Sequence, residues 1–130
     1  MNIYDATLRV APGFDAERFA QRGHDLVLVA RDHARLETLA AKLRGEHNVA
    51  VEVLAADLTQ LGDLHTVEAR LRDDASIGIL INNAGAAQSG SFIEQSTDSV
   101  AHLVALNTTA LVRLASAIAP RLATAGNGAI

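Results

Sequence analysis

The sequence predicts an α/β domain built on a doubly wound parallel sheet in truncated form. Three short apolar runs, near residues 25–31, 49–56 and 77–82, have the length and β-branched content of strands buried on both faces. Stretches with helical spacing separate these runs, which is the pattern of a parallel sheet with crossover helices. The chain has 130 residues, 49% hydrophobic and 20% charged, which suits one globular domain.

Composition excludes several classes of function. The net charge of -4 and the absence of basic runs argue against binding to nucleic acid. Because cysteine is absent, the chain has no disulfide, CxxC metal site or thiol nucleophile, and we expect a cytoplasmic protein. We expect no membrane contact, because no run approaches the ~20 apolar residues of a span and the first ten residues lack the features of a secretory signal.

The first clear strand along the chain is Asp25–Ala30, a continuous apolar run. Residues 15–22 before it have helical spacing, and Gly23 is expected to end that helix. Further upstream, the segment from Ile3 to Val10 can form an extended strand because its apolar residues alternate with polar ones. Two charged residues in this segment suit a buried central strand poorly.

The middle of the chain alternates between helix and strand. Asp32 is placed to cap a helix whose apolar spacing continues to Leu43, and Gly45 is expected to end it. The second run, Val49 to Ala56, ends at Asp57. Helical spacing resumes at Thr59, and the third run is Ile77–Ile81.

A long helix is predicted towards the C-terminus. A polar loop from Ala86 to Ser91 precedes it, and Ser91 to Glu94 match a capping box, which is a structural signal. The apolar stripe expected to face the core is Val100, Leu103, Val104, Leu111, Leu114 and Ile118. Pro120 lies near the end of the helix, Gly126-Asn127-Gly128 is expected to turn, and Ala129-Ile130 to open a further strand.

Polar or small residues follow each predicted strand, where an open parallel sheet binds its ligands. The three strand ends are Ala30-Arg31-Asp32, Ala56-Asp57-Leu58 and Asn82-Asn83-Ala84-Gly85. Taken one at a time, the two aspartates read as caps or turn formers and the asparagine pair as a plain turn. Taken together and in this order, the three ends favour a ligand-binding edge.

The same segments resemble the short-chain dehydrogenase/reductase family. The resemblance rests on DLVLVARD (Asp25 to Asp32), Asp57-Leu58, ILINNAG (Ile79 to Gly85) and Leu106-Asn107, and covers roughly Gly23 to Ile130. NNAG after an apolar strand is fairly specific, DL is weak alone, and their spacing strengthens both. The resemblance implies one partial NAD(P)-binding domain of Rossmann type over residues 1–130. In the family order, only Ile3 to Val10 can fill the central position between the first and third apolar runs.

The resemblance also implies roles for five residues that follow the predicted strands, where the nucleotide would bind. Asp57 would accept a hydrogen bond from the adenine amino group, and Leu58 would pack beside the ring. Residues at the adenosine ribose would be Asn83, Ala84 and Gly85.

Arg31 stands where the family places a cation against the ribose 2′-phosphate. Because arginine offers a planar donor fork for phosphate, we expect NADP(H) as cofactor rather than NAD(H). The alternative is that Arg31 is a solvated charge at the end of its strand, next to Asp32.

The role of Asn107 can first be considered without the family resemblance. This residue falls on the apolar stripe of the long helix. A side-chain amide among apolar neighbours must find partners or it costs ~1–3 kcal/mol, so it is either a satisfied core group or part of a site. The residue alone favours the core reading. The resemblance reverses this preference: Asn107 would be catalytic, loosening the helix, holding a water and extending a proton relay.

Two family motifs do not occur in these 130 residues. The glycine-rich turn TGxxxGxG corresponds to Ala6 to Gly13, where bulky side chains and Pro12 make a pyrophosphate cradle doubtful. The family's catalytic serine and YxxxK pair have no counterpart, since the only tyrosine is Tyr4 and the only lysine Lys42. The five histidines show no close metal-ligand spacing, so no metal is expected.

Two hypotheses follow. The first is part of an oxidoreductase that transfers hydride between NADP(H) and a small-molecule carbonyl or alcohol, shortened by truncation, a frame change or fragmentation, and inactive alone. The second is a non-catalytic module that binds nucleotide weakly or pairs with another protein. In both, the apolar helix over residues 100–122 should make the chain form homo-oligomers or aggregate, with Ala105, Leu106, Ala110, Val112, Ala115 and Ala117 outside the core-facing set.

Overall fold

The computed structural model describes residues 2–6 and 14–130. The strands are β1 Asn2–Ala6, β2 Asp25–Ala30, β3 Val51–Ala55 and β4 Ile77–Ile81. The helices are α1 Phe14–Gln21, α2 His33–His47, α3 Leu61–Asp73, α4 Thr97–Val104 and α5 Leu111–Ala125, with a 3-10 turn at Phe92–Glu94 and a π-helical segment at Ala105–Ala110 between α4 and α5.

The strands form one parallel sheet in the order β3-β2-β1-β4. This order confirms the predicted doubly wound architecture, and β1 takes the central position for which the N-terminal segment was the only candidate. Of the predicted strand Ile3 to Val10, the part after Ala6 lies outside the described residues. Most of the stretch that replaces the glycine-rich turn, Ala6 to Gly13, lies outside them too, so the doubt about a pyrophosphate cradle stays a prediction.

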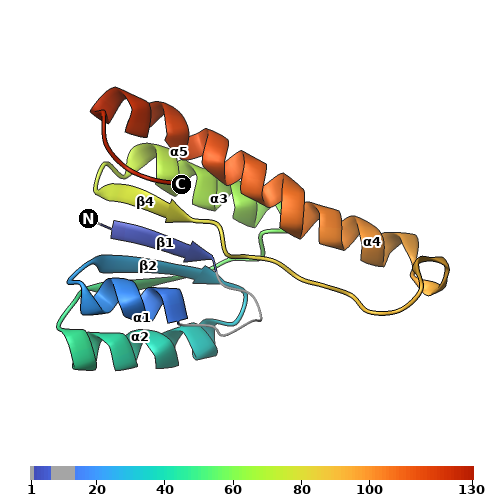
Figure 1. The fold of residues 1–130 in the computed structure, drawn as a ribbon, viewed down its shortest axis with the longest axis horizontal. Coiled ribbons are helices and arrows are strands. Elements are labelled where there is room, and N and C mark those ends of the chain that lie inside the picture. The colour runs from blue at the N-terminus through green and yellow to red at the C-terminus, as the bar shows by residue number, and fades with distance from the viewer. Residues whose placement is uncertain (1, 7–13) are drawn as a thin grey trace.

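Helices cover both faces of the sheet (Figure 1). On one face, α1 and α2 pack on β2 and β3 through Ala20, Leu36, Leu43 and their buried neighbours. On the other, α3 and α5 pack on β2 and β4 through a second buried cluster. Burial of alternate residues of β2 against opposite faces is the pattern expected of an interior parallel strand.

A further strand begins where the sequence predicted one. Ala129 lies beside β4 in parallel register with Ile79, donating its N–H to the Gly78 carbonyl at 3.1 Å and accepting from the Leu80 N–H at 3.0 Å. Gly128 turns the chain into this pairing with φ at +120°, and a Cβ there would lie 2.7 Å from the Gly78 oxygen. Glycine is therefore required at this turn.

The predicted helix ends are partly confirmed. Asp32 caps α2 by accepting from the Arg35 N–H at 3.0 Å, and Gly23 follows α1 with φ at +82°. The prediction that Gly45 ends α2 is wrong, because the helix continues to His47. Asn48 takes the left-handed conformation instead and donates its N–H to the Arg44 carbonyl, which satisfies the helix end.

The predicted stripe of the long helix is half wrong. Leu114 and Ile118 are buried, but Val104 and Leu111 are 52% and 40% exposed. The buried set recurs every four residues: Leu106, Ala110, Leu114, Ile118 and Leu122. A regular α-helix would turn such a set away from the core by about 40° at each step. The wider π-helical turns at Ala105–Ala110 take up part of this drift and bring Leu106 and Ala110 into the core.

The continuous helix Thr97–Ala125 is 29 residues long, and an 18-residue window in it has a mean hydropathy of 1.4. By length and composition alone this helix could cross a membrane. The sequence predicted no such segment, because scattered polar residues interrupt the apolar run. Its buried stripe packs on the sheet and on α3. Only 22% of the window is buried, so much of the helix faces outward.

Candidate functional site

The carboxyl ends of β2, β3 and β4 meet at one edge of the sheet (Figure 1). The three segments predicted to bind a ligand follow these ends directly, so the parallel pairing brings them to one edge. Arg31, next after β2, is exposed. Asp32, its neighbour, is engaged as the cap of α2, which confirms the structural reading of that aspartate.

Asp57 is held in a fixed orientation after β3. Its Oδ1 accepts from the Thr59 N–H at 2.9 Å and from the Thr59 hydroxyl at 2.6 Å. Its own N–H donates to Oδ2 of Asp63 at 2.8 Å. This turn confirms the structural reading of Asp57, but it uses one carboxylate oxygen only. Among the hydrogen bonds of the described residues, Oδ2 of Asp57 accepts none, so it can accept from a ligand.

The hydrogen bonds from Thr59 favour the ionised form of Asp57, and nearby positive charge adds to their effect. Partial burial by itself raises the pKa of the carboxyl, but the two hydrogen bonds from Thr59 and the positive charges of Arg31 and His102 together lower the pKa below 3.8. Arg31 and Asp57 therefore interact electrostatically, as two residues that bind the same ligand would. His102, from α4, contributes to the same electrostatic effect, which could not be read from sequence spacing.

Leu58 lies deeper than its predicted role suggests. Its side chain is 3% exposed and packs in the cluster between the sheet and α3. The predicted contact with an adenine ring stays a prediction, and a buried side chain leaves little surface for it. Asn83 is exposed after β4, Ala84 is half-buried against the same cluster, and Gly85 is half-buried beside it.

Asn107 joins the long helix to the loop after β4. Its Oδ1 accepts from the Ala86 N–H at 2.8 Å, and its Nδ2 donates to the Ala86 carbonyl at 2.7 Å. A Cβ on Gly85 would lie 3.4 Å from the same Oδ1, so the loop passes close to the amide. Asn107 is exposed rather than buried on the apolar stripe, because the π-helical segment shifts that stripe to Leu106.

The backbone around Asn107 departs from regular α-helix. The residue lies within the π-helical segment. In a regular α-helix the Leu111 N–H would donate to the Asn107 carbonyl, but here it donates to the Thr108 carbonyl.

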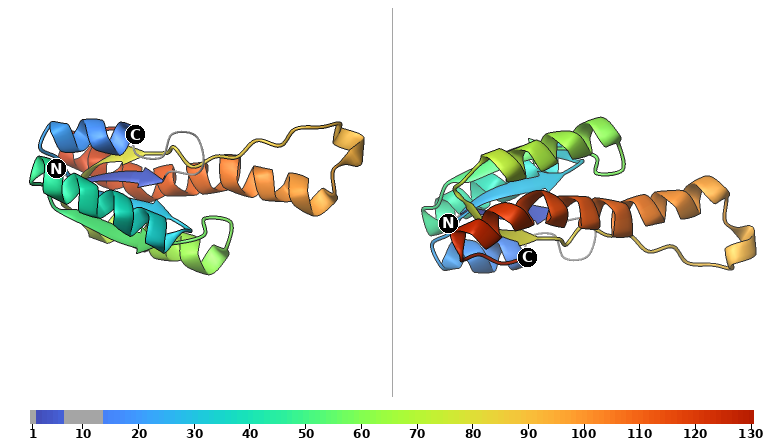
Figure 2. Two further views of the ribbon diagram at one scale, coloured as in Figure 1. Left: turned by 90° about the horizontal axis from the view of Figure 1, so that it is seen from below. Right: turned by 90° about the horizontal axis from the view of Figure 1, so that it is seen from above.

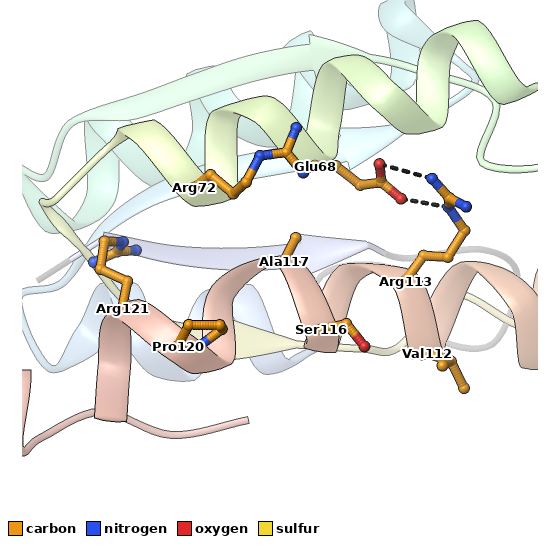
Figure 3. A pocket seen from close by; sticks show the side chains of 8 residues that line it. All are labelled: Glu68, Arg72, Val112, Arg113, Ser116, Ala117, Pro120 and Arg121. Atoms are coloured by element: carbon orange, nitrogen blue, oxygen red, sulfur yellow. Dashed lines mark hydrogen bonds and ion pairs between the residues drawn. The ribbon is translucent and has the colours of Figure 1, made fainter. Parts of the chain in front are cut away.

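A groove of about 580 Å³ lies between α3 and α5, away from the strand ends (Figure 3). Its lining residues are Glu68, Arg72, Val112, Arg113, Ser116, Ala117, Pro120 and Arg121. The buried Glu68 carboxylate accepts from Arg113 at 2.5 and 3.0 Å, and Arg121 donates to the carbonyls of Leu71, Ala75 and Ile77. These bonds clamp α5 onto the end of α3, and the groove is separate from the candidate nucleotide edge.

Several known proteins are similar to this chain in sequence and in fold. The family model described as short chain dehydrogenase matches residues 14–130. The short-chain dehydrogenase from Sphingobium yanoikuyae in complex with NADPH is 55% identical with a TM-score of 0.92, over 98% of this chain and 50% of that one. The bulky-bulky ketone specific alcohol dehydrogenase from Comamonas testosteroni is 52% identical with a TM-score of 0.94, over 98% of this chain and 51% of that one.

Curated relatives are more distant. The very-long-chain 3-oxoacyl-CoA reductase from Vanderwaltozyma polyspora is 34% identical over 110 residues, which are 82% of this chain and 32% of that protein. The chain therefore spans about half the length of the two solved structures and about a third of the curated relative.

We predict that Asn107→Ala loosens the loop after β4. Loss of the two bonds to Ala86 should lower the free energy of unfolding by about 1–2 kcal/mol and speed hydrogen exchange at the Ala86 amide. Urea unfolding and native-state exchange measure the two effects. Thr108→Ala, a change at the exposed neighbour, should alter neither. Unchanged exchange at Ala86 in the Asn107 variant would contradict the predicted tie.

We predict a pH signature for Asp57. Because its pKa is lowered in the folded chain, the carboxylate stabilises the fold above the unfolded pKa of ~3.9 and loses this contribution as pH falls through the folded pKa. The stability difference between wild type and Asp57→Asn should therefore shrink as pH falls from 5 to 3. Urea unfolding at each pH measures it, with Asp73→Asn as an exposed control of equal charge. A difference that does not vary with pH would refute the role of the charge.

Proposed function

Because the chain belongs to the short-chain dehydrogenase family, we propose that it is the nucleotide-binding part of an oxidoreductase that uses NADP(H). The observation that carries the proposal is the placement of Arg31, Asp57 and Asn83–Gly85 after the carboxyl ends of β2, β3 and β4, at the same side of the parallel sheet. Such an edge is where doubly wound sheets bind dinucleotides. The NADPH complex of a 55% identical relative supports the same choice of cofactor.

The proposed roles follow from the chemistry of the edge. Asp57 is ionised and keeps one carboxylate oxygen available, so it can accept from the adenine amino group. Arg31 is exposed beside it and can pair with the ribose 2′-phosphate, which NADP(H) has and NAD(H) lacks. Asn83, Ala84 and Gly85 would line the ribose, where the half-buried Gly85 lets the chain approach closely.

Asn107 is proposed as the contribution of this chain to catalysis. Its side chain fixes the helix to the loop at Ala86. We propose that its backbone carbonyl holds a water in a proton relay. The proposed reaction is hydride transfer between NADP(H) and a ketone or secondary alcohol, a class that fits a ketone-specific relative and a 3-oxoacyl reductase. A cytoplasmic location is part of the proposal.

These 130 residues hold no serine and YxxxK set after a further strand, so we expect no hydride transfer by them alone. Nucleotide binding without turnover would agree with this expectation. The second candidate function, a non-catalytic binding or interaction module, is favoured by the outward-facing apolar residues of the long helix.

We predict that the chain binds NADP(H) weakly and in preference to NAD(H), and that Arg31→Ala removes the preference. Loss of a charged hydrogen bond of ~1.5–3 kcal/mol should weaken NADPH binding by about 10- to 100-fold and leave NADH unchanged. Titration by fluorescence or calorimetry measures both affinities. Arg35→Ala, in the first turn of α2, is the control of equal charge. Equal affinities for the two cofactors, unaffected by Arg31→Ala, would end the proposed role.

The outward face of the long helix supports association between copies of the chain. Val104, Leu111 and Val112 are exposed on it, and Val112 also lines the groove between α3 and α5. Figure 2 shows α4 extending well beyond the sheet, where neither helical layer covers it. Exposed apolar area of this kind marks an interaction surface, and we propose a second copy of the chain as its partner.

We predict that the chain sediments as a dimer or larger species at tens of micromolar. Val112→Glu should shift it towards monomer, because burying an unpaired charge opposes association. Leu61→Glu, the same kind of change at a 63% exposed position on α3, should leave the distribution unchanged. Analytical ultracentrifugation separates the cases. A wild-type monomer with cooperative unfolding would contradict the proposal and show that these residues close their own core.

A further inference from the structure

Two carboxylates and one imidazole, which are side chains that can bind a metal ion, come together between α1 and α2. They lie on the face of the sheet opposite to the long helix. Glu17 of α1 and Glu46 and His47 of α2 each offer one ligand atom, and the three atoms lie within 4.8 Å of one another. The two helices pack side by side on the sheet (Figure 1). Because α2 begins at the carboxyl ends of the strands and His47 is its last residue, the set is remote from the nucleotide edge.

The imidazole of His47 is the observation that points to a ligand. Its Nε2 is fully buried and has no hydrogen-bond partner among the described residues. The nearest charged oxygen, Oε2 of Glu46, is 3.8 Å away, beyond hydrogen-bond distance. A buried polar atom without a partner is costly, and a metal ion between Nε2 and the two carboxylates would satisfy it.

The position of Lys42 shows that positive charge is stabilised between the two carboxylates. Its Nζ lies 3.4 Å from Oε1 of Glu17 and 3.8 Å from Oε2 of Glu46, so the ammonium already bridges the two carboxylates. Both contacts are long, and all three side chains are between 36% and 49% exposed. Ion pairs of this kind contribute little, so a divalent ion with directed bonds can displace the lysine.

We propose that Glu17, Glu46 and His47 form a zinc site that joins α1 to α2, in competition with the Lys42 ammonium. One imidazole nitrogen and two carboxylate oxygens suit zinc, with water as the fourth ligand. Tetrahedral bonds of ~2.0–2.1 Å put neighbouring ligand atoms ~3.4 Å apart, which the observed spacing reaches with small side-chain rotations. Magnesium is disfavoured because it prefers an all-oxygen octahedral set.

The spacing of ligands along the sequence could not reveal this site. Glu17 lies 29 residues before Glu46 and on another helix, and the adjacent Glu46-His47 pair matches no recognised motif. The prediction that the chain binds no metal therefore rested on local spacing alone. The site depends only on the packing of α1 on α2 and is independent of the proposed cofactor.

Zinc titration of the chelator-treated chain tests the proposal. We expect one zinc per chain by calorimetry and, at 100 times the dissociation constant, a rise of about 10 °C in the thermal midpoint. His47→Ala should weaken binding by about 100-fold or more, since loss of a group that only hydrogen-bonds to a metal ligand already costs ~10–100-fold. Glu17→Gln, which keeps the shape of the side chain, should weaken it as well. His65→Ala, at an exposed histidine of α3, is the matched control and should change nothing.

Lys42→Ala separates the zinc site from a simple ion-pair cluster. Removing the competing ammonium should strengthen zinc binding about two- to fivefold, the size of an exposed ion pair. Weaker zinc binding in Lys42→Ala would overturn the proposal, as would equal binding in wild type and His47→Ala. Failure of the wild type to bind zinc at 100 μM would overturn it too. Magnesium should give no shift in the thermal midpoint, and a shift that matches zinc would contradict the proposed ligand chemistry.

Discussion

The parallel pairing of β1 with β2 on one side and β4 on the other is the constraint on which the candidate site depends. Because all strands run the same way, segments that are about 25 residues apart in the sequence leave the sheet at one edge. Arg31, Asp57 and the residues after β4 are brought together by this direction alone. A single antiparallel strand would send its segment to the opposite edge.

Backbone tethers hold the polar groups of this edge in place. Thr59 fixes Asp57, and the Asn107 amide makes two bonds to Ala86. In both cases one polar side chain satisfies a turn or a loop, and in Asp57 the Oδ2 atom is still left as an acceptor. Local structure and proposed chemistry are thus served by the same residues, which explains why structural and functional readings of Asp57 are compatible.

Strands and layers were predictable because they follow from local pattern. Apolar runs such as Asp25–Ala30 are strands whatever surrounds them, and the order of alternating elements implied a parallel sheet. Errors arose where distant contacts decide the outcome. Gly45 stays helical because Asn48 ends α2 one turn later. The positions of His102 near Asp57 and of Glu17 near His47 depend on helix packing, which residue spacing does not encode.

The π-helical segment Ala105–Ala110 sets a strict length requirement on the long helix. A regular α-helix turns about 100° per residue, and the wide turns of this segment already hold more residues per turn, so one residue more in this segment would turn α4 by about that angle relative to α5. Leu106 would leave the core and Asn107 would point away from Ala86, although no side chain had changed chemically. Substitutions on the exposed face are therefore better tolerated than an insertion between Val104 and Leu111. Natural variation in length should be confined to the loop before Thr97.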